Sequence, residues 1–395
     1  MCTSPLLRIR AKYKVPNNCR LVSILDSYST KTKGYKMISW KKVSSLYPSF
    51  SMLYDDLNRY FDYMFIPCRK CDECRMRYAR DWSIRNYHEF TMRKVGCFIT
   101  LTIDSAKAHL FTDDMRTYCK RCVKGNRFIK FPIDYTLCRG LIYDWIKKMR
   151  DTLSKRYGVK IRYFGCGEYG SVENSERPHY HILIYGYDFP DKVLFKKSKK
   201  GSDCYISEEL SKLWPYGIHT IQSIEYGICM YASKYVMKKV KFDGDSSLSE
   251  FEKYYGREPE FLFMSKGNCQ SNRCKYINEI ITNCKGLNSL RNLDNPYCKF
   301  CSKTRGGLGY DWLCKYYHDV IKLGYVVIEG IKYPIPKYYL DVINLTSPET
   351  YAKLKLKNLD HVDELNEEHP EYLSIEHLNV RKKIIRDKLK RTRRE

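Results

Sequence analysis

Residues 177–186, RPHYHILIYG, place two histidines one residue apart at the start of an apolar stretch. Alternate side chains of a β-strand point to the same face, so His179 and His181 share one face while Tyr180 lies on the other. Two imidazoles on one face can bind the same divalent ion. In a chain with nine histidines, the pair alone does not distinguish a metal site from two structural histidines.

Strand and helix patterns alternate around this stretch. Four segments have strand patterns, a hairpin joins the second to the third, and two segments have the apolar spacing of helices. The strands are KVGCFITLTID (94–104), VKIRYFGCGEYG (159–170), HYHILIYG (179–186) and GIHTIQSI (217–224), and the helices are LIYDWIKKMRDTL (141–153), closed by Gly158, and ICMYASKYVMKKV (228–240). With a short helix near ELSKLW, this order predicts an α+β fold, a ferredoxin-like palm with a central antiparallel sheet and helices on one face.

The strength of the pattern divides the chain into three expected regions. Residues 1–93 are irregular and contain a cysteine cluster, residues 94–245 form the palm, and residues 246–395 are a weakly patterned basic region. The last stretch, RKKIIRDKLKRTRRE, has nine Lys or Arg between 381 and 394. Such a stretch is typical of a solvated basic helix that contacts phosphates.

Composition indicates a polyanionic partner. Lys and Arg number 71 against 45 Asp and Glu, a formal net charge of +26, and an excess of this size favours nucleic acid binding. No apolar run reaches 18 residues, which argues against a membrane span. The stretch MCTSPLLRIRAKYKV lacks the apolar core of a secretory signal, and 18 cysteines then indicate free or metal-bound thiols. We therefore expect a cytoplasmic protein.

Glu168 is the expected third metal ligand. It lies in GCGEYG, on the strand that pairs with the histidine strand in the predicted hairpin. A carboxylate beside two imidazoles suits Mg²⁺ or Mn²⁺ better than structural zinc. The same stretch spells G-x-G-x-x-G, but SVENSERP follows it where a dinucleotide-binding fold requires a helix. The chain also lacks a G-x-x-x-x-G-K-[ST] phosphate loop.

The segment YASKYVMKK (231–239) places two tyrosines on one helix face. Tyr231 and Tyr235 are four residues apart, and Lys234 and Lys238 each follow a tyrosine by three residues. Phenols beside ammonium groups suit nucleophilic attack on a phosphodiester, because the lysines favour the phenolate and hold the phosphate. An amphipathic helix with tyrosines at the edge of the core gives the same pattern, so both interpretations stay open here.

In their order, FITLTID, GCGEYG with RPHYHILIYG, and YASKYVMKK resemble the motifs of rolling-circle replication initiators of the His-hydrophobic-His endonuclease superfamily. The paired tyrosines, PCRKCDECR upstream, LWPYGIHTIQSI and GGLGYDW (306–312) make the chain most similar to the initiators of microviruses, especially gokushoviruses. The resemblance covers residues 68–312. It implies metal-binding histidines, two nucleophilic tyrosines, helix lysines, a less constant third ligand and structural threonines: His179 and His181; Tyr231 and Tyr235; Lys234 and Lys238; Glu168; Thr100 and Thr102.

The resemblance also implies a function. Residues 94–245 would be a nicking endonuclease domain that uses Mg²⁺ or Mn²⁺ to cut phage replicative-form DNA at the origin. One tyrosine would form a 5′-phosphotyrosine intermediate, and the second would allow the unit-length strand to be rejoined. The implied partners are viral single-stranded and replicative-form DNA, with a host DNA polymerase and helicase, in the cytoplasm of a bacterium.

The cysteines leave a different class of function open. Cys68, Cys71 and Cys74 form C-x2-C-x2-C, and either zinc with a fourth ligand from elsewhere or reduced structural thiols would explain them. Two further C-x2-C pairs are Cys119/Cys122 and Cys298/Cys301. The alternatives are therefore a non-catalytic zinc-dependent nucleic-acid-binding protein and a related single-strand transposase. A nicking assay with Mn²⁺ separates the first of these from an endonuclease.

Overall fold

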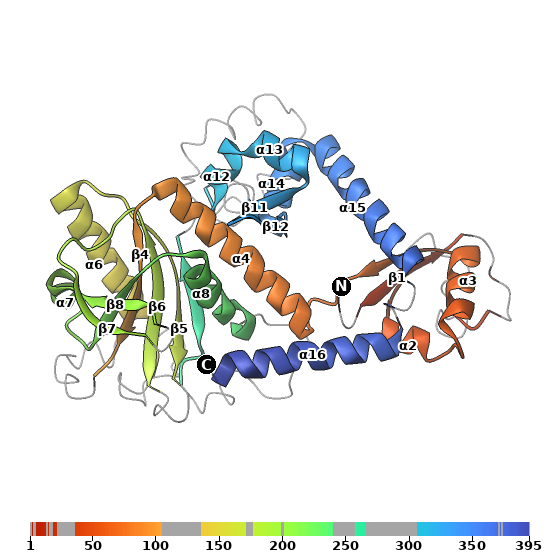
Figure 1. Ribbon diagram of the computed structural model, residues 1–395, viewed down its shortest axis with the longest axis horizontal. Helices are drawn as coiled ribbons and strands as arrows, with labels where there is room; N and C mark the ends of the chain where they lie inside the picture. Colours follow the sequence, from red (N-terminus) through yellow and green to blue (C-terminus); the bar gives the residue numbers. More distant parts are fainter. Residues whose placement is uncertain are drawn as a thin grey trace, which may run out of the picture. The chain divides into compact units, whose positions relative to one another are not determined.

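The computed structural model describes residues 2, 5–12, 15, 19–21, 36–104, 136–170, 177–198, 201–239, 257–265, 306–369, 372 and 374–394 (Figure 1). The chain forms two compact units, one of residues 1–78 with 353–395 and one of residues 79–352. These units have other limits than the three regions expected from sequence, which stay a prediction. The pairs Cys119/Cys122 and Cys298/Cys301 lie outside the described residues.

The second unit is built on a seven-stranded sheet in the order β10-β5-β6-β4-β9-β8-β7, and every pairing in it is antiparallel. The strands are β4 (Gly96–Thr102), β5 (Arg162–Tyr169), β6 (Pro178–Tyr185), β7 (Val193–Lys197), β8 (Asp203–Ile206), β9 (His219–Ser223) and β10 (Phe261–Met264). The central four, β5-β6-β4-β9, have the spatial order of a ferredoxin-like βαββαβ unit. The predicted α+β fold and antiparallel sheet are confirmed.

Helices cover both faces of this sheet (Figure 1). The crossover helices α6 (Arg139–Tyr157) and α7 (Glu208–Leu213) pack on the face of Ile99 and Tyr180. Helices α4 (Asp72–Arg93) and α8 (Tyr226–Lys239) cover the opposite face, where Trp82 lies 5.2 Å from Phe164 between ring centroids. The expectation of helices on one face holds for the crossover helices and is corrected for α8. Because β4 is buried on both faces, the sheet requires cover on both sides.

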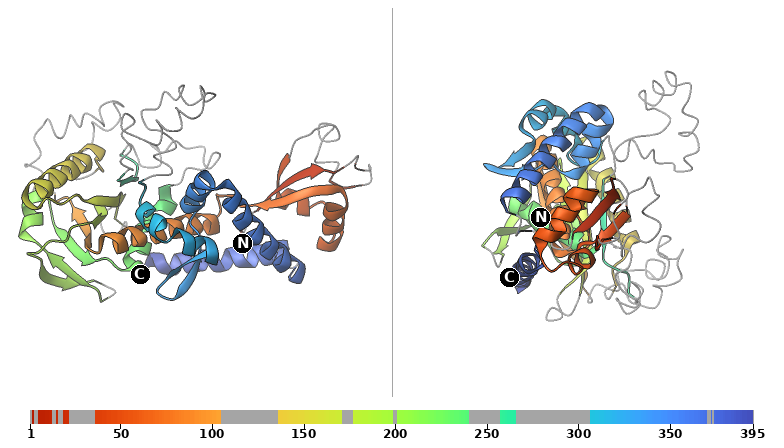
Figure 2. Two further views of the ribbon diagram at one scale, coloured as in Figure 1. Left: turned by 90° about the horizontal axis from the view of Figure 1, so that it is seen from above. Right: turned by 90° about the vertical axis from the view of Figure 1, so that its right-hand side faces the viewer.

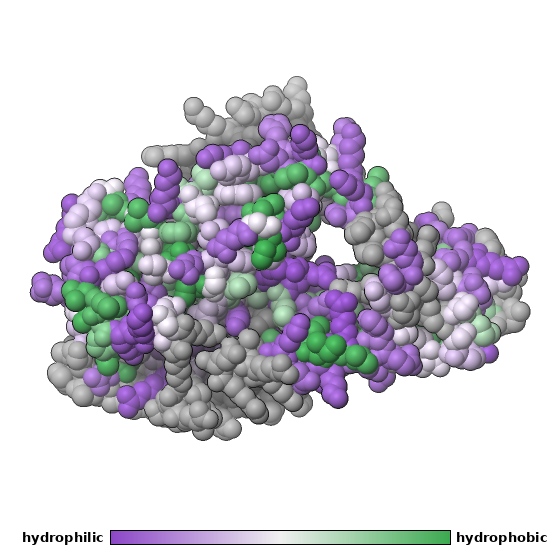
Figure 3. Space-filling view, in the orientation of Figure 1, coloured by the Kyte–Doolittle hydropathy of each residue, from purple (hydrophilic) through white to green (hydrophobic). Residues whose placement is uncertain are grey.

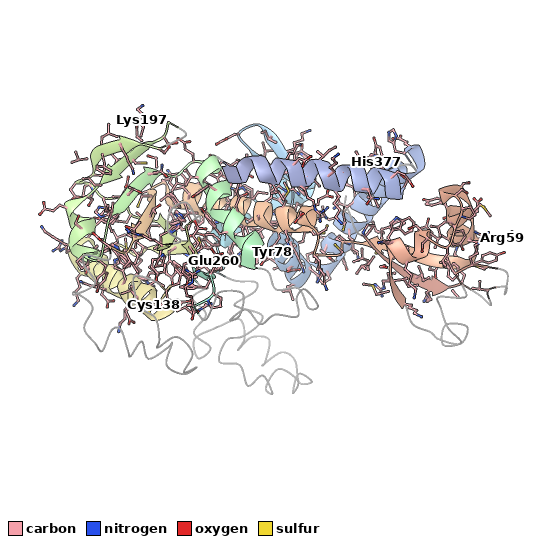
Figure 4. All side chains as sticks on the ribbon, turned by 90° about the horizontal axis from the view of Figure 1, so that it is seen from below. Arg59, Tyr78, Cys138, Lys197, Glu260 and His377 are labelled. Carbon is pink, nitrogen blue, oxygen red and sulfur yellow. The ribbon has the colours of Figure 1, made fainter. Side chains whose placement is uncertain are left out.

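Helix α6 begins and ends with recognisable caps. Cys138 precedes it, and its Sγ accepts a hydrogen bond from the backbone N–H of Leu141. Figure 4 labels Cys138 beside the first turn of this helix. The helix ends at Gly158, which has φ 66° and the left-handed conformation that glycine adopts at low cost. The end of the helix predicted from Gly158 is confirmed.

The sequence GGLGYDW connects the last part of the second unit to α4. It leads into α12 (Tyr310–Lys315), α13 (Tyr317–Leu323), the hairpin of β11 (Tyr325–Ile328) and β12 (Ile331–Pro334), and α14 (Lys337–Thr346). The backbone N–H of Gly309 donates to buried Glu89 at 2.9 Å, and the Trp312 ring stacks on His88 with centroids 3.4 Å apart. His88 also contacts the Tyr339 hydroxyl at 2.9 Å. These contacts give the motif a structural role.

The first unit contains a three-stranded antiparallel sheet in the order β2-β1-β3 (Figure 2). Its elements are β1 (Leu6–Ala11), β2 (Lys36–Ser39), β3 (Phe61–Ile66), α2 (Trp40–Ser44), α3 (Phe50–Tyr60) and α16 (Ile375–Arg394). Leu378 of α16 belongs to the same buried cluster as Leu7 and Phe61. The expected basic helix at 381–394 is thus part of a longer helix with an apolar anchor. Helix α15 (Pro348–Glu368) spans the limit between the two units in sequence.

Most of the visible surface is hydrophilic (Figure 3), which agrees with the charge composition. A hydrophobic area lies over the β7–β8 hairpin, where Val193, Leu194 and Phe195 are exposed. Among the described residues, no helix is both long and apolar enough to cross a bilayer.

Candidate active site

The register of three strands places the predicted metal ligands on one face of the sheet. Strand β6 lies between β5 and β4, and His179 is directly opposite Glu168 on β5. On the other side, His181 is opposite Thr100 on β4. Directly opposed residues of an antiparallel pair point to the same face. Glu168, His179, His181 and Thr100 therefore share the face that α8 covers.

The three predicted ligands converge on one point. The Oε1 atom of Glu168 lies 2.8 Å from Nε2 of His179 and 3.2 Å from Nε2 of His181. The ligand atoms of all three side chains lie within 4.8 Å of one another. Two imidazole nitrogens and one carboxylate oxygen in this arrangement fit a hard divalent ion that keeps other positions open for substrate.

Contacts of the opposite ring nitrogens orient both imidazoles. Nδ1 of His179 donates to the backbone oxygen of Arg177 at 3.1 Å, since a carbonyl oxygen only accepts. In the neutral ring, Nε2 is then an acceptor that faces the Glu168 carboxylate, and such a contact requires a proton or a cation between the two atoms. Nδ1 of His181 contacts Thr100 Oγ1 at 3.0 Å. Such hydrogen bonds to the far nitrogen are typical of metal-binding histidines.

Glu168 is a charged group inside the protein. Its residue is 5% exposed, and that of His181 is 6% exposed. Burial alone raises the pKa of the Glu168 carboxyl, but the hydrogen bonds and charges of His179 and His181 together lower this pKa well below its usual range. The carboxyl group is therefore ionised and provides a negative ligand.

Helix α8 brings both predicted tyrosines against the histidine cluster. The Tyr235 ring stacks on the His181 imidazole with centroids 5.2 Å apart and an interplanar angle of 13°. The Tyr231 ring meets the same imidazole edge-on at 5.6 Å, and the two phenol rings are 5.4 Å apart. Tyr231 is 38% exposed, whereas Tyr235 is 8% exposed. The residues predicted from two distant motifs thus lie together.

The phenols do not have the lowered pKa that the sequence suggested. Burial and the nearby Glu168 carboxylate raise the pKa of both Tyr231 and Tyr235. Lys234 is half-buried on α8, and Lys238 lies in the same helix with its side chain outside the described residues. A positive charge close to Glu168 would act against this rise, because it would compensate the carboxylate.

Phe98 is a site residue that sequence reasoning missed. Its ring lies nearly parallel to the His181 imidazole, with centroids 5.5 Å apart, and edge-on to Tyr231 at 6.0 Å. Phe98 precedes Thr100 by two residues on β4, so the alternation of side chains places both on the site face. That periodicity in FITLTID was the signal that could have identified it.

The glycines of GCGEYG serve packing of the sheet. A Cβ atom at Gly165 would lie 2.6 Å from the Phe263 ring and 2.8 Å from the backbone oxygen of His181. Glycine therefore lets β10 and its aromatic side chains approach β5 closely. This role explains the G-x-G-x-x-G pattern without a dinucleotide.

Comparison with known proteins agrees with the family resemblance. Residues 96–240 match the family described as replication-associated protein ORF2. The chain is 27% identical over 297 residues to replication-associated protein VP4 of Bdellovibrio phage phiMH2K, covering 74% of this chain and 73% of the relative. It is 29% identical over 215 residues to replication-associated protein ORF2 of Spiroplasma virus 4, covering 54% and 58%.

A third relative extends over more of the sequence. Replication-associated protein ORF4 of Chlamydia phage 1 is 23% identical over 377 residues, covering 87% of this chain and 74% of the relative. No solved structure matches the chain. The resemblance inferred from the motifs is confirmed: residues 96–240 belong to the replication-associated protein ORF2 family, in a chain related to replication-associated proteins of microvirus-like phages.

Proposed function

We propose that this protein is a rolling-circle replication initiator that nicks replicative-form phage DNA at its origin and becomes joined to the 5′ end through a tyrosine. The observation that carries the proposal is the contact of Tyr231 and Tyr235 with His181, one of three convergent metal-ligand side chains. The names of the relatives support a role in phage replication. The net charge of +26 suits a DNA substrate.

The ligand set favours Mg²⁺ or Mn²⁺. His179, His181 and Glu168 would hold the ion, and the protein matrix fixes the two imidazoles through Arg177 and Thr100. When bound, the ion offsets charge on the non-bridging oxygens of the scissile phosphate. Three protein ligands leave coordination positions for those oxygens.

The tyrosines provide the nucleophile. The phenolic oxygen attacks phosphorus, the new P–O bond to tyrosine forms, and the bond from phosphorus to the 3′ oxygen breaks. The phenol loses its proton, and the departing oxygen takes one up to give a free 3′-hydroxyl that a host polymerase can extend. The phosphotyrosine keeps the energy of the phosphodiester, so the same 3′-hydroxyl chemistry in reverse rejoins a unit-length strand.

The difference in exposure suggests an order for the two tyrosines. Tyr231 is 38% exposed and accessible to a DNA strand, whereas Tyr235 is 8% exposed and stacked on His181. We infer that Tyr231 makes the first cut. Tyr235 would act once the bound strand has displaced neighbouring side chains, while Tyr231 still holds the first 5′ end.

A nicking assay tests the proposal on supercoiled replicative-form DNA of the phage that encodes the chain, with Mn²⁺ or with a chelator. Wild-type protein should nick only with the metal and leave a protease-sensitive adduct on the 5′ side. Tyr231→Phe plus Tyr235→Phe should abolish the adduct while DNA binding persists. Tyr157→Phe, at an exposed tyrosine of α6, should behave as wild type.

Each outcome distinguishes the proposal from its alternatives. An adduct that survives the double substitution would refute the tyrosine assignment. DNA binding without cleavage in Mn²⁺ would favour a non-catalytic nucleic-acid-binding protein. If Tyr235→Phe alone abolishes the first cut and Tyr231→Phe leaves it intact, the proposed order is wrong.

A further inference from the structure

Four cysteine thiols come together in the first unit, away from the histidines in sequence. Cys68, Cys71 and Cys74 are joined by Cys2, which no local spacing in the sequence connects to them. Cys2 Sγ lies 3.4 Å from the Sγ of Cys68 and 3.5 Å from those of Cys71 and Cys74. All four cysteines are free, and two of them are buried.

The strand register explains why Cys2 reaches the cluster. Strands β1 and β3 pair antiparallel with Leu6 opposite Ile66. Continuing this register beyond the paired residues places Cys2 opposite Lys70, between Cys68 and Cys71. The backbone N–H of Cys68 donates to Cys2 Sγ at 3.3 Å, which ties the two chain segments together.

The distances fit four ligands of one ion. A disulfide requires an S–S distance of roughly 2.05 Å, so the observed spacing does not represent a pair of disulfides. A tetrahedral zinc ion with Zn–S bonds of about 2.3 Å separates its sulfurs by about 3.8 Å. The observed separations are close to that value, and a tetrahedral set of four thiolates is typical of zinc.

The backbone around the cluster is arranged to accept negative charge on sulfur. The N–H groups of Lys70 and Cys71 donate to Cys68 Sγ at 3.4 and 3.3 Å. Arg69 has φ 62°, a left-handed conformation that is uncommon outside glycine and that turns the loop between the two cysteines. Cys71 immediately precedes α4, and Cys74 lies in its first turn, where the helix N-terminus favours a thiolate.

We propose that Cys2, Cys68, Cys71 and Cys74 bind one structural zinc ion. With four protein ligands the site is closed, in contrast to the three-ligand histidine site. The ion connects the residue that precedes β1, the end of β3 and the start of α4, so that metal binding contributes to folding of the first unit. The proposal does not depend on the nicking activity, since neither set of ligands contains a residue of the other.

Metal analysis of the full-length protein tests the stoichiometry and the fourth ligand. Wild-type protein purified with zinc should retain one zinc ion per chain. Cys2→Ser should weaken zinc binding by no less than the roughly 10–100-fold that loss of an outer-shell partner costs. Cys314→Ser, at an exposed cysteine of α12, is the matched control and should keep the ion. His179→Ala plus His181→Ala should also keep it, which separates this site from the histidine site.

A spectroscopic measurement covers the case in which Cys2→Ser does not fold. Co²⁺ should replace zinc in the wild-type chain and give the intense thiolate-to-cobalt charge-transfer band and the visible bands of a tetrahedral four-thiolate site. A spectrum of octahedral cobalt would overturn the proposal. So would the presence of iron and sulfide, or a Cys2→Ser protein that folds and binds zinc as tightly as the Cys314→Ser control.

Discussion

Tyr180 lies between the two histidines of β6, but its side chain points to the opposite face and fixes the start of α6. The backbone N–H of Cys138 donates to the Tyr180 hydroxyl at 2.9 Å, and this hydroxyl donates to the Cys138 oxygen at 3.2 Å. Tyr180 is fully buried. Tyr180→Phe removes both hydrogen bonds and leaves a buried N–H without this partner, a loss we estimate at about 1–3 kcal/mol.

Tyr185→Phe provides a matched control on the same strand. Tyr185 is also fully buried, but its hydroxyl has no hydrogen-bond partner among the described residues. Removal of an unpaired buried hydroxyl should leave the free energy of unfolding unchanged or raise it slightly. The two substitutions delete the same atom at the same depth, so their difference isolates the hydrogen bonds of Tyr180.

Thermal unfolding followed by circular dichroism measures this difference. For a unit of this size, 1 kcal/mol corresponds to roughly 2–4 °C, so a loss of about 2 kcal/mol lowers the midpoint by about 4–8 °C. Nicking at low temperature should persist in Tyr180→Phe, because His179 and His181 point to the other face. Equal midpoints for the two variants would show that the hydroxyl of Tyr180 does not stabilise the fold.

Three further predictions concern charged and titratable groups. Glu168→Gln should weaken Mn²⁺ binding by roughly 10–100-fold or more in an electron paramagnetic resonance titration; unchanged affinity would exclude it as a ligand. Burial lowers the pKa of His88 from 6.5 to about 3, so the folded protein stays neutral there while the unfolded chain takes up a proton. Stability should therefore fall as pH decreases from 6.5 towards 3, by up to about 5 kcal/mol from this group, and the fall should be smaller in His88→Gln. Glu89→Gln, which leaves the half-buried Arg162 without its ion pair, should cost about 3–5 kcal/mol in urea unfolding. The exposed control Glu208→Gln should cost at most about 1 kcal/mol.

The palm and its site were largely predictable because their signals are local. The alternation of β6 fixed the shared face of His179 and His181, and four-residue spacing fixed the shared face of Tyr231 and Tyr235. Gly158 marked the end of α6. The approach of the tyrosine helix to the histidine strand required a family resemblance, since no local pattern predicts which face of a sheet a helix covers.

The first unit was not predictable from local patterns. Its three strands are short, β1 and β3 are separated by 49 residues between Ala11 and Phe61, and its core includes Leu378 near the other end of the sequence. Cys2 joins the cysteine cluster only through the β1–β3 register. These relations depend on tertiary pairing, which the spacing of residues along the chain does not encode.

The raised pKa of the phenols also lay outside sequence reasoning. The lysines next to the tyrosines are visible in the sequence, whereas the burial of Tyr235 and its closeness to the Glu168 carboxylate appear only in the fold. The physical consequence is that a cation held by the histidine cluster, more than the helix lysines, is expected to favour the phenolate.

The most direct test of the shared site is to identify the residue that becomes attached to DNA. After cleavage with Mn²⁺, nuclease digestion of the adduct and mass spectrometry of its peptides locate the remaining nucleotide. We expect modification of the α8 peptide at Tyr231, and at Tyr235 when Tyr231 is replaced by Phe. A nucleotide attached to a residue outside α8, or cleavage that never forms an adduct, would show that the two tyrosines are not the nucleophiles.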